Sequence, residues 1–186
     1  MKKILGLMAV LLSSTALADG LTDGHFYAGA GMGRGRIALN PAHTGSGSHD
    51  AFDTVGPVLS GGYAFKMGPV VEASYGTYAT KYTFNYFDNY WVDEAKLMVG
   101  WSISLGDFLY VIPKVGMNWW ALQVHPGAVD HLGIDKTTTF RGSARVWEVD
   151  IEVPLTERFH PYIGYSKINY DYGQIQNTRL GLNYVF

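Results

Sequence analysis

Cysteine is absent from the 186-residue sequence, and charged residues are scarce. Without cysteine the chain forms no disulfides and offers no thiolate ligands to a metal ion. Asp, Glu, Lys and Arg together make up 16% of the residues, well below the roughly 25% of a typical soluble domain. The net charge is −2 and no segment is strongly basic, which excludes a nucleic-acid-binding protein.

Long apolar runs and helical periodicity are also missing beyond the N-terminus. No later stretch approaches the ~18 apolar residues of a membrane-spanning helix. The N-terminal MKKILGLMAVLLSSTALADG contains two lysines, a short apolar stretch and the small residues Ala16 and Ala18, a pattern typical of a secretory leader. We therefore predict a signal peptide over 1–18, cleaved after Ala18, and a single exported domain over 19–186.

Aromatic residues and glycine are abundant instead, with 13 Tyr, 9 Phe, 5 Trp and 23 Gly. This composition favours strands over helices. Apolar residues alternate with small or polar ones, which is the period of a half-buried strand. The alternating segments lie near 26–36, 54–66, 69–81, 91–105, 108–122, 140–153, 159–171 and 177–186.

The connections between these segments alternate in length. Short links at 67–68, 106–107 and 154–158 alternate with longer loops near 37–53, 82–90 and 123–139. Short turns at one end and long loops at the other are typical of outer-membrane barrels. The sequence therefore predicts an all-β fold, an eight-stranded antiparallel up-and-down transmembrane β-barrel.

Each of five strands combines a largely apolar face with a face that carries charge or glycine. A soluble β-sandwich has the same period, but here the aromatic ends of the apolar faces and the export of the chain favour a lipid-facing exterior. The polar faces then line the interior, and their parity places these charged residues there: Glu72, Lys96, Lys114, Glu148, Asp150, Glu152 and Arg179.

An eight-stranded barrel has an interior that side chains just about fill. Unpaired buried ions cost several kcal/mol, so the four predicted interior acids are expected to pair with the three bases. We expect a plugged barrel; a narrow or transient ion path through the charge network is the alternative.

The mature chain resembles the small eight-stranded outer-membrane proteins of the OmpA transmembrane-domain type. The resemblance rests on FYAGAGMG (26–33), GGYAFKMGPVVEASYG (61–76), YVIPKVGMNWW (110–120) and RLGLNYVF (179–186). It implies an interior acid–base network, with Glu72 and Lys114 at matching positions, and a location in the cell outer membrane. Tyr162 stands near the place of a further interior arginine of that family.

The resemblance also implies a role for the last strand. Leu180, Leu182, Tyr184 and Phe186 share one face, and such a terminal aromatic strand is the signal that the outer-membrane assembly machinery reads in these proteins. Phe186 is expected at the interface girdle of the periplasmic side.

Motifs that suggest other chemistry are weak. GAGMGRG (29–35) has glycines spaced as in a dinucleotide-binding loop, but no helix pattern follows it. GSGSHD (45–50) brings Ser, His and Asp together, but neighbours on one loop do not readily form a catalytic triad. His43, His49, His125 and His131 lie in two loops without the ligand spacing of a metal site. We expect no catalytic residues, no metal and no cofactor.

The outer surface suggests the partners. Five basic residues near the loop-side strand ends are candidates for binding lipopolysaccharide phosphates: Arg34, Arg36, Lys81, Arg141 and Arg145. Tyr78 and the aromatic residues that follow it are expected in an upper girdle or at the loop tips.

We predict a monomeric structural or surface protein that is plugged or at most weakly pore-forming. Two alternatives remain, a surface adhesin acting through the loops 37–53 and 123–139 and a lipid A-modifying enzyme.

Overall fold

The computed structural model describes residues 24–39, 51–80, 90–106, 108–124, 137–170 and 173–186. These residues form strands and turns, and none of their segments is a helix able to cross a membrane. The strands are β1 (His25–Leu39), β2 (Ala51–Ala64), β3 (Pro69–Thr80), β4 (Tyr90–Trp101), β5 (Ile103–Ser104), β6 (Tyr110–Val124), β7 (Thr138–Glu152), β8 (Phe159–Tyr170) and β9 (Gly173–Val185).

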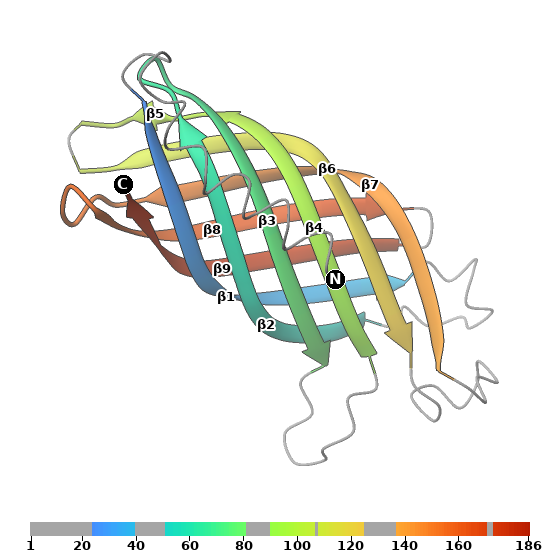
Figure 1. The fold of residues 1–186 in the computed structure, drawn as a ribbon. Helices are drawn as coiled ribbons and strands as arrows, with labels where there is room; N and C mark the ends of the chain where they lie inside the picture. Colours follow the sequence, from blue (N-terminus) through green and yellow to red (C-terminus); the bar gives the residue numbers. More distant parts are fainter. Residues whose placement is uncertain (1–23, 40–50, 81–89, 107, 125–136, 171–172) are drawn as a thin grey trace.

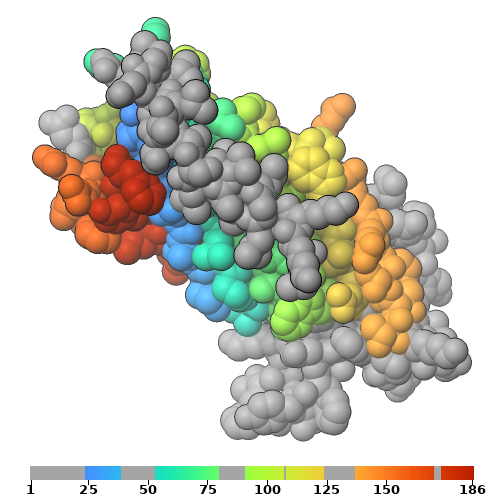
Figure 2. Space-filling model, viewed as in Figure 1, coloured from blue at the N-terminus to red at the C-terminus, as the bar shows by residue number. Residues whose placement is uncertain are grey.

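The strands close into an eight-stranded antiparallel barrel (Figure 1). Each strand pairs with its neighbours in the chain, and β1 pairs with β9 to close the sheet. β4 and β5 are two parts of one strand interrupted at Ser102, since both pair with β6. Figure 2 shows the first strand (blue) and the C-terminal residues (red) side by side on the surface. Closure leaves no unpaired sheet edge in the membrane.

Short connections gather at one end of the barrel, which we call the turn end. The Phe65–Gly68 turn is held by the Gly68 amide donating to the Phe65 carbonyl at 2.9 Å, and Gly68 has a φ of 106° that favours glycine. The C-terminus lies at the same end (Figure 1). The opposite end, the loop end, leads to the loops, most of whose residues lie outside the described ones.

Four strands are longer than the sequence predicts. The pairing of β1 with β2 continues to Ala38–Ala51, and that of β6 with β7 continues to Val124–Thr138, so these strands extend into the ranges predicted as loops.

The outer wall carries large apolar side chains that are exposed in the isolated chain. Val115 is 60% exposed and Leu180 is 62% exposed, the opposite of a soluble domain, where such residues are buried. Aromatic side chains cluster at the turn end of this wall. Phe26 packs on Tyr63, and Phe159 packs on Tyr184. This arrangement is a lipid-facing surface with an interfacial aromatic girdle.

The interior contains a buried apolar cluster and a charged network that lie side by side along the barrel axis. The apolar cluster consists of Ile37, Val58, Tyr78, Val92, Met98, Ala144, Val146, Ile168 and Ile175. On β4 the buried Glu94 and Lys96 stand between two of its members, Val92 and Met98, and Met98 pairs with Glu72 of β3. Small residues leave room for these side chains, as at Gly33, where the Tyr78 ring lies against the β1 backbone.

Tyr78 corrects one expectation from the sequence. The sequence suggests a place in the upper girdle or at the loop tips, but Tyr78 is only 3% exposed, and its hydroxyl accepts a 2.6 Å hydrogen bond from the Asn177 amide. The physical reason is parity, because Tyr78 lies six residues after the inward-facing Glu72 on the same strand.

Candidate functional site: the barrel interior and its mouth

Lys114 occupies the centre of the polar part of the interior. Its Nζ lies 2.8 Å from Glu72, 2.9 Å from Glu148 and 2.5 Å from Asp150. All four side chains are buried. They come from β3, β6 and β7, so this contact ties together strands from different parts of the wall. Burying these four charged groups costs free energy because each loses its hydration. The charge-assisted hydrogen bonds between the ammonium and the three carboxylates offset that cost.

Arg179 on β9 supplies the second cation of this layer. Its guanidinium donates to Glu148 and lies 3.3 Å from Asp150 and 3.8 Å from Glu72. The Arg179 side chain also lies over the Tyr162 ring, 5.6 Å from its centroid. Tyr162 on β8 therefore provides an aromatic face to an arginine on the neighbouring strand.

Lys96 extends the charges toward the loop end. Its Nζ lies 3.4 Å from Glu94 and 3.6 Å from Glu148, and it donates to the Ser166 hydroxyl at 3.3 Å. Sequence reasoning missed Glu94, which is only 2% exposed. The sequence does carry a signal for it, because Glu94 has the parity of the inward-facing Lys96 on the same strand.

Three interior carboxylates approach one another as metal ligands would. Oxygens of Glu72, Glu148 and Asp150 lie within 4.8 Å of one another, the one such group among the described residues. The Lys114 ammonium lies within 2.9 Å of all three residues, however, and so takes the position that a cation would occupy. The arrangement is a cage for the protein's own ammonium group.

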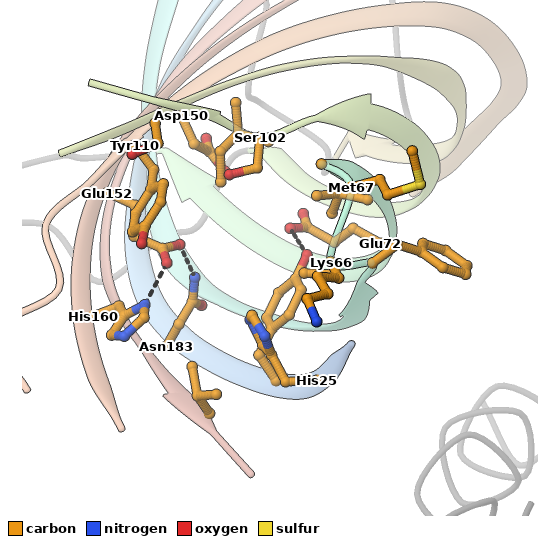
Figure 3. Close-up of a pocket in the computed structure, with 18 residues that line it drawn as sticks. His25, Lys66, Met67, Glu72, Ser102, Tyr110, Asp150, Glu152, His160 and Asn183 are labelled. Atoms are coloured by element: carbon orange, nitrogen blue, oxygen red, sulfur yellow. Dashed lines mark hydrogen bonds and ion pairs between the residues drawn. The ribbon is translucent and has the colours of Figure 1, made fainter. Parts of the chain in front are cut away.

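Glu152 is separate from this layer. It was predicted in the interior network, and it is half-buried, but its carboxylate contacts His160 Nδ1 at 2.7 Å and Asn183 Nδ2 at 2.8 Å (Figure 3). These contacts lie in the wall of a cavity of about 320 Å³ at the turn end. The seven predicted interior residues are thus divided between a central layer and this mouth.

The residues of the predicted C-terminal signal lie on the outer wall. Leu180, Leu182 and Phe186 are exposed, and the Tyr184 ring packs on Phe186 with centroids 5.1 Å apart. The Phe186 amide donates to the Phe26 carbonyl at 3.0 Å. The last residue therefore takes part in closing the barrel.

Four of the five predicted basic surface residues are described, and they face outward. Arg34 pairs with Asp53 at 3.1 Å, and Arg36, Arg141 and Arg145 are exposed; Arg145 lies at the middle of β7 rather than at its loop end. Lys81, the four loop histidines, the GSGSHD segment and the leader over 1–18 lie outside the described residues.

A closed antiparallel barrel with a lipid-facing wall, an aromatic girdle and a charged interior defines an integral protein of the outer membrane. The family comparison agrees. The chain belongs to the outer membrane protein beta-barrel domain family, whose model matches residues 5–186. Its place is therefore the cell outer membrane. In barrels of this kind the short turns usually face the periplasm.

Solved structures show the same fold at low sequence identity. Ail, the attachment invasion locus protein of Yersinia pestis, is 11% identical with a TM-score of 0.66, over 89% of this chain and 100% of that one. Neisserial surface protein A is 12% identical with a TM-score of 0.64, over 87% and 97%. The N-terminal barrel domain of Pseudomonas aeruginosa OprF is 15% identical with a TM-score of 0.59, over 88% and 100%. No curated protein matches the sequence.

Proposed function

We propose that this protein is a closed, non-enzymatic barrel with a structural and surface role in the outer membrane. The observation that carries the proposal is the filled interior. The Lys114 ion-pair layer and the buried apolar cluster that includes Met98 and Ile168 fill it together. Met98 and Ile168 are both 0% exposed. An ion would have to break these ion pairs and lose its hydration shell beside the apolar side chains.

Conductance in planar lipid bilayers tests this proposal. We expect the full-length protein to show no stable open state. The variant Met98→Ala/Ile168→Ala removes two buried side chains of the apolar cluster and serves as a comparison, in which brief openings are expected because large-to-small changes leave a cavity. A steady conductance of the unaltered protein would contradict the closed interior.

The non-enzymatic part of the proposal has its own readout. Lipid A from cells that express the protein should have the same mass as lipid A from cells with an empty vector. Gain or loss of an acyl chain or phosphate on expression would refute it and favour a lipid A-modifying enzyme.

We also propose outer-leaflet lipopolysaccharide as the lipid partner. Gln176 of β9 lies opposite Arg36 of β1 on one side and opposite Lys167 of β8 on the other. The two cations therefore lie in one row across the outer wall, two strands apart. Neighbouring strands are about 4.8 Å apart, which places both cations within reach of one phosphorylated head group. Arg36→Ala/Lys167→Ala should lower the amount of co-purified lipopolysaccharide. Arg158→Ala, at the turn end, should leave it unchanged.

A surface adhesin is the second candidate, supported by the fold shared with the attachment protein Ail. Trimming 40–50 and 125–136 should abolish binding to host cells or matrix if this function holds. Equal binding by the trimmed protein would show that these loops do not carry the adhesion.

Under either function we propose that the protein is a monomer. We propose that it is exported by a leader cleaved after Ala18 and inserted by the assembly machinery. N-terminal sequencing of the mature protein should then begin at Asp19.

A further inference from the structure

The mouth of the barrel contains a cavity that the closed-barrel function does not use. It has a volume of about 320 Å³ and opens at the turn end, where residues of every strand except β4 and of the Phe65–Gly68 turn line it (Figure 3). This volume is at the lower end of the range for small-molecule sites. The floor of the cavity includes Glu72 and Asp150, so it reaches the ion-pair layer but not the apolar cluster.

The described interior carries more acid than base. Five carboxylates face inward (Glu72, Glu94, Glu148, Asp150 and Glu152), against three bases (Lys96, Lys114 and Arg179). The central acids share Lys114 and Arg179, and Lys96 lies between Glu94 and Glu148. The interior thus has an excess of two negative charges, which attracts a cation. The cavity itself is lined by three of the acids, Glu72, Asp150 and Glu152, and by one lysine, Lys66 of the exposed turn.

Glu152 is the excess acid that the cavity exposes. Its two oxygens contact an imidazole nitrogen of His160 and the amide of Asn183, neither of which carries a permanent charge. The Glu152 side chain is 13% exposed, so it is partly desolvated and yet reachable from the mouth. A carboxylate in this state gains most from a charged hydrogen-bond donor.

The surroundings of Glu152 suit an organic cation. The Tyr110 ring stacks on the His160 ring, with centroids 6.5 Å apart and planes inclined by 16°, and Tyr27 and Phe65 also line the cavity. Aromatic faces attract alkylammonium ions as well as their apolar parts. Two lining residues keep buried acceptors without a hydrogen bond, Asn183 through Oδ1 and Glu72 through Oε1. Such acceptors call for a donor.

We propose that this periplasmic mouth cavity binds a small organic ammonium ion, with Glu152 as the counter-ion. The Lys114 side chain shows that this barrel can hold an alkylammonium group among carboxylates. The ligand enters from the periplasm and stops at the ion-pair layer. The inference goes beyond the closed-barrel function and does not depend on whether the interior conducts.

The test uses the full-length protein in lipid nanodiscs and 1,4-diaminobutane as the probe. Amide NMR signals of Tyr110, His160 and Asn183 should shift saturably with the diamine and not with 1,4-butanediol, which has the same length without charge. Glu152→Gln should weaken binding about tenfold or more, because a hydrogen bond to a charged group is lost. Glu152→Asp should retain most of the affinity.

Glu157→Gln is the matched control, with the same charge change on an exposed residue of the neighbouring turn. Its affinity should equal that of the unaltered protein, and heat-modifiable migration in gels verifies that every variant is folded. Equal shifts with the diol, unchanged affinity of folded Glu152→Gln, or shifts with Zn²⁺ but not with the diamine would each overturn the proposal.

Discussion

Lys114 is the residue on which most interior contacts converge. Its removal leaves Glu72, Glu148 and Asp150 close together with Arg179 as their main remaining counter-charge. We expect Lys114→Met to lower the free energy of unfolding by about 3–5 kcal/mol, because breaking one side of a buried ion pair leaves uncompensated charge.

Urea unfolding in lipid vesicles measures this change. Arg141→Met, at an exposed residue of β7, serves as the comparison and should stay within about 0.5 kcal/mol of the unaltered protein. A loss of less than about 1 kcal/mol for Lys114→Met would mean that the ion-pair layer contributes little to stability.

Two glycines of β2, Gly56 and Gly61, differ in how much space surrounds them. A methyl group at Gly56 would overlap the Thr77 carbonyl oxygen of β3, whereas at Gly61 the nearest atom is 3.6 Å away. We expect Gly56→Ala to destabilise the barrel by about 1–3 kcal/mol through overpacking, and Gly61→Ala to be nearly neutral. Equal unfolding midpoints for the two variants would contradict the close approach of β2 and β3.

Among the elements, β9 has two roles, since it closes the barrel on β1 and carries the aromatic C-terminus. Deletion of Phe186 removes a single hydrogen bond, from its amide to Phe26, together with the ring contact to Tyr184. We therefore expect the deletion to reduce the amount of folded protein in the outer membrane severalfold while changing the stability of the refolded barrel by about 1 kcal/mol or less.

Quantitative blotting of outer-membrane fractions, combined with urea unfolding of refolded protein, separates these two effects. Phe65→Ala removes an exposed aromatic side chain from the same end of the barrel and should leave membrane levels unchanged. Normal levels of the protein without Phe186 would show that the terminal aromatic residue is not an assembly signal here.

The strand faces could be predicted from the sequence because side chains in a strand alternate with a period of two. Glu72, Lys114 and Asp150 were placed inward on this ground, and their side chains are buried. The same rule also holds for Glu94 and Tyr78, which lie toward the loop ends of their strands and share the inward parity of Lys96 and Glu72. Contacts across the barrel could not be predicted in this way, because they depend on how far each strand is staggered against the next.

For the whole molecule, the positions of the two ends decide what each surface contacts. The protein contains no cysteine, so single introduced cysteines can report on topology without background. In intact cells, a membrane-impermeant thiol reagent should label Thr139→Cys near the loop end and leave Glu157→Cys at the turn end unlabelled until the outer membrane is opened. Labelling of Glu157→Cys in intact cells would reverse the assigned orientation and move the mouth cavity to the outside.

The sequence by itself determined the class of this protein. Alternation, scarce charge, abundant aromatic residues and uneven connections reflect the bilayer, which requires every backbone group to be paired within the protein and every strand to turn an apolar face outward. These requirements act on each strand separately, so they are visible in the chain.

Only the tertiary structure decided how the interior is divided. Closure between β1 and β9, with the stagger of all the strands, brings Lys114 to three carboxylates and assigns Glu152 instead to a cavity with His160 and Asn183. Residues far apart in sequence meet there because the barrel is a closed ring, and the position of each side chain around that ring is set by all of the strand registers together.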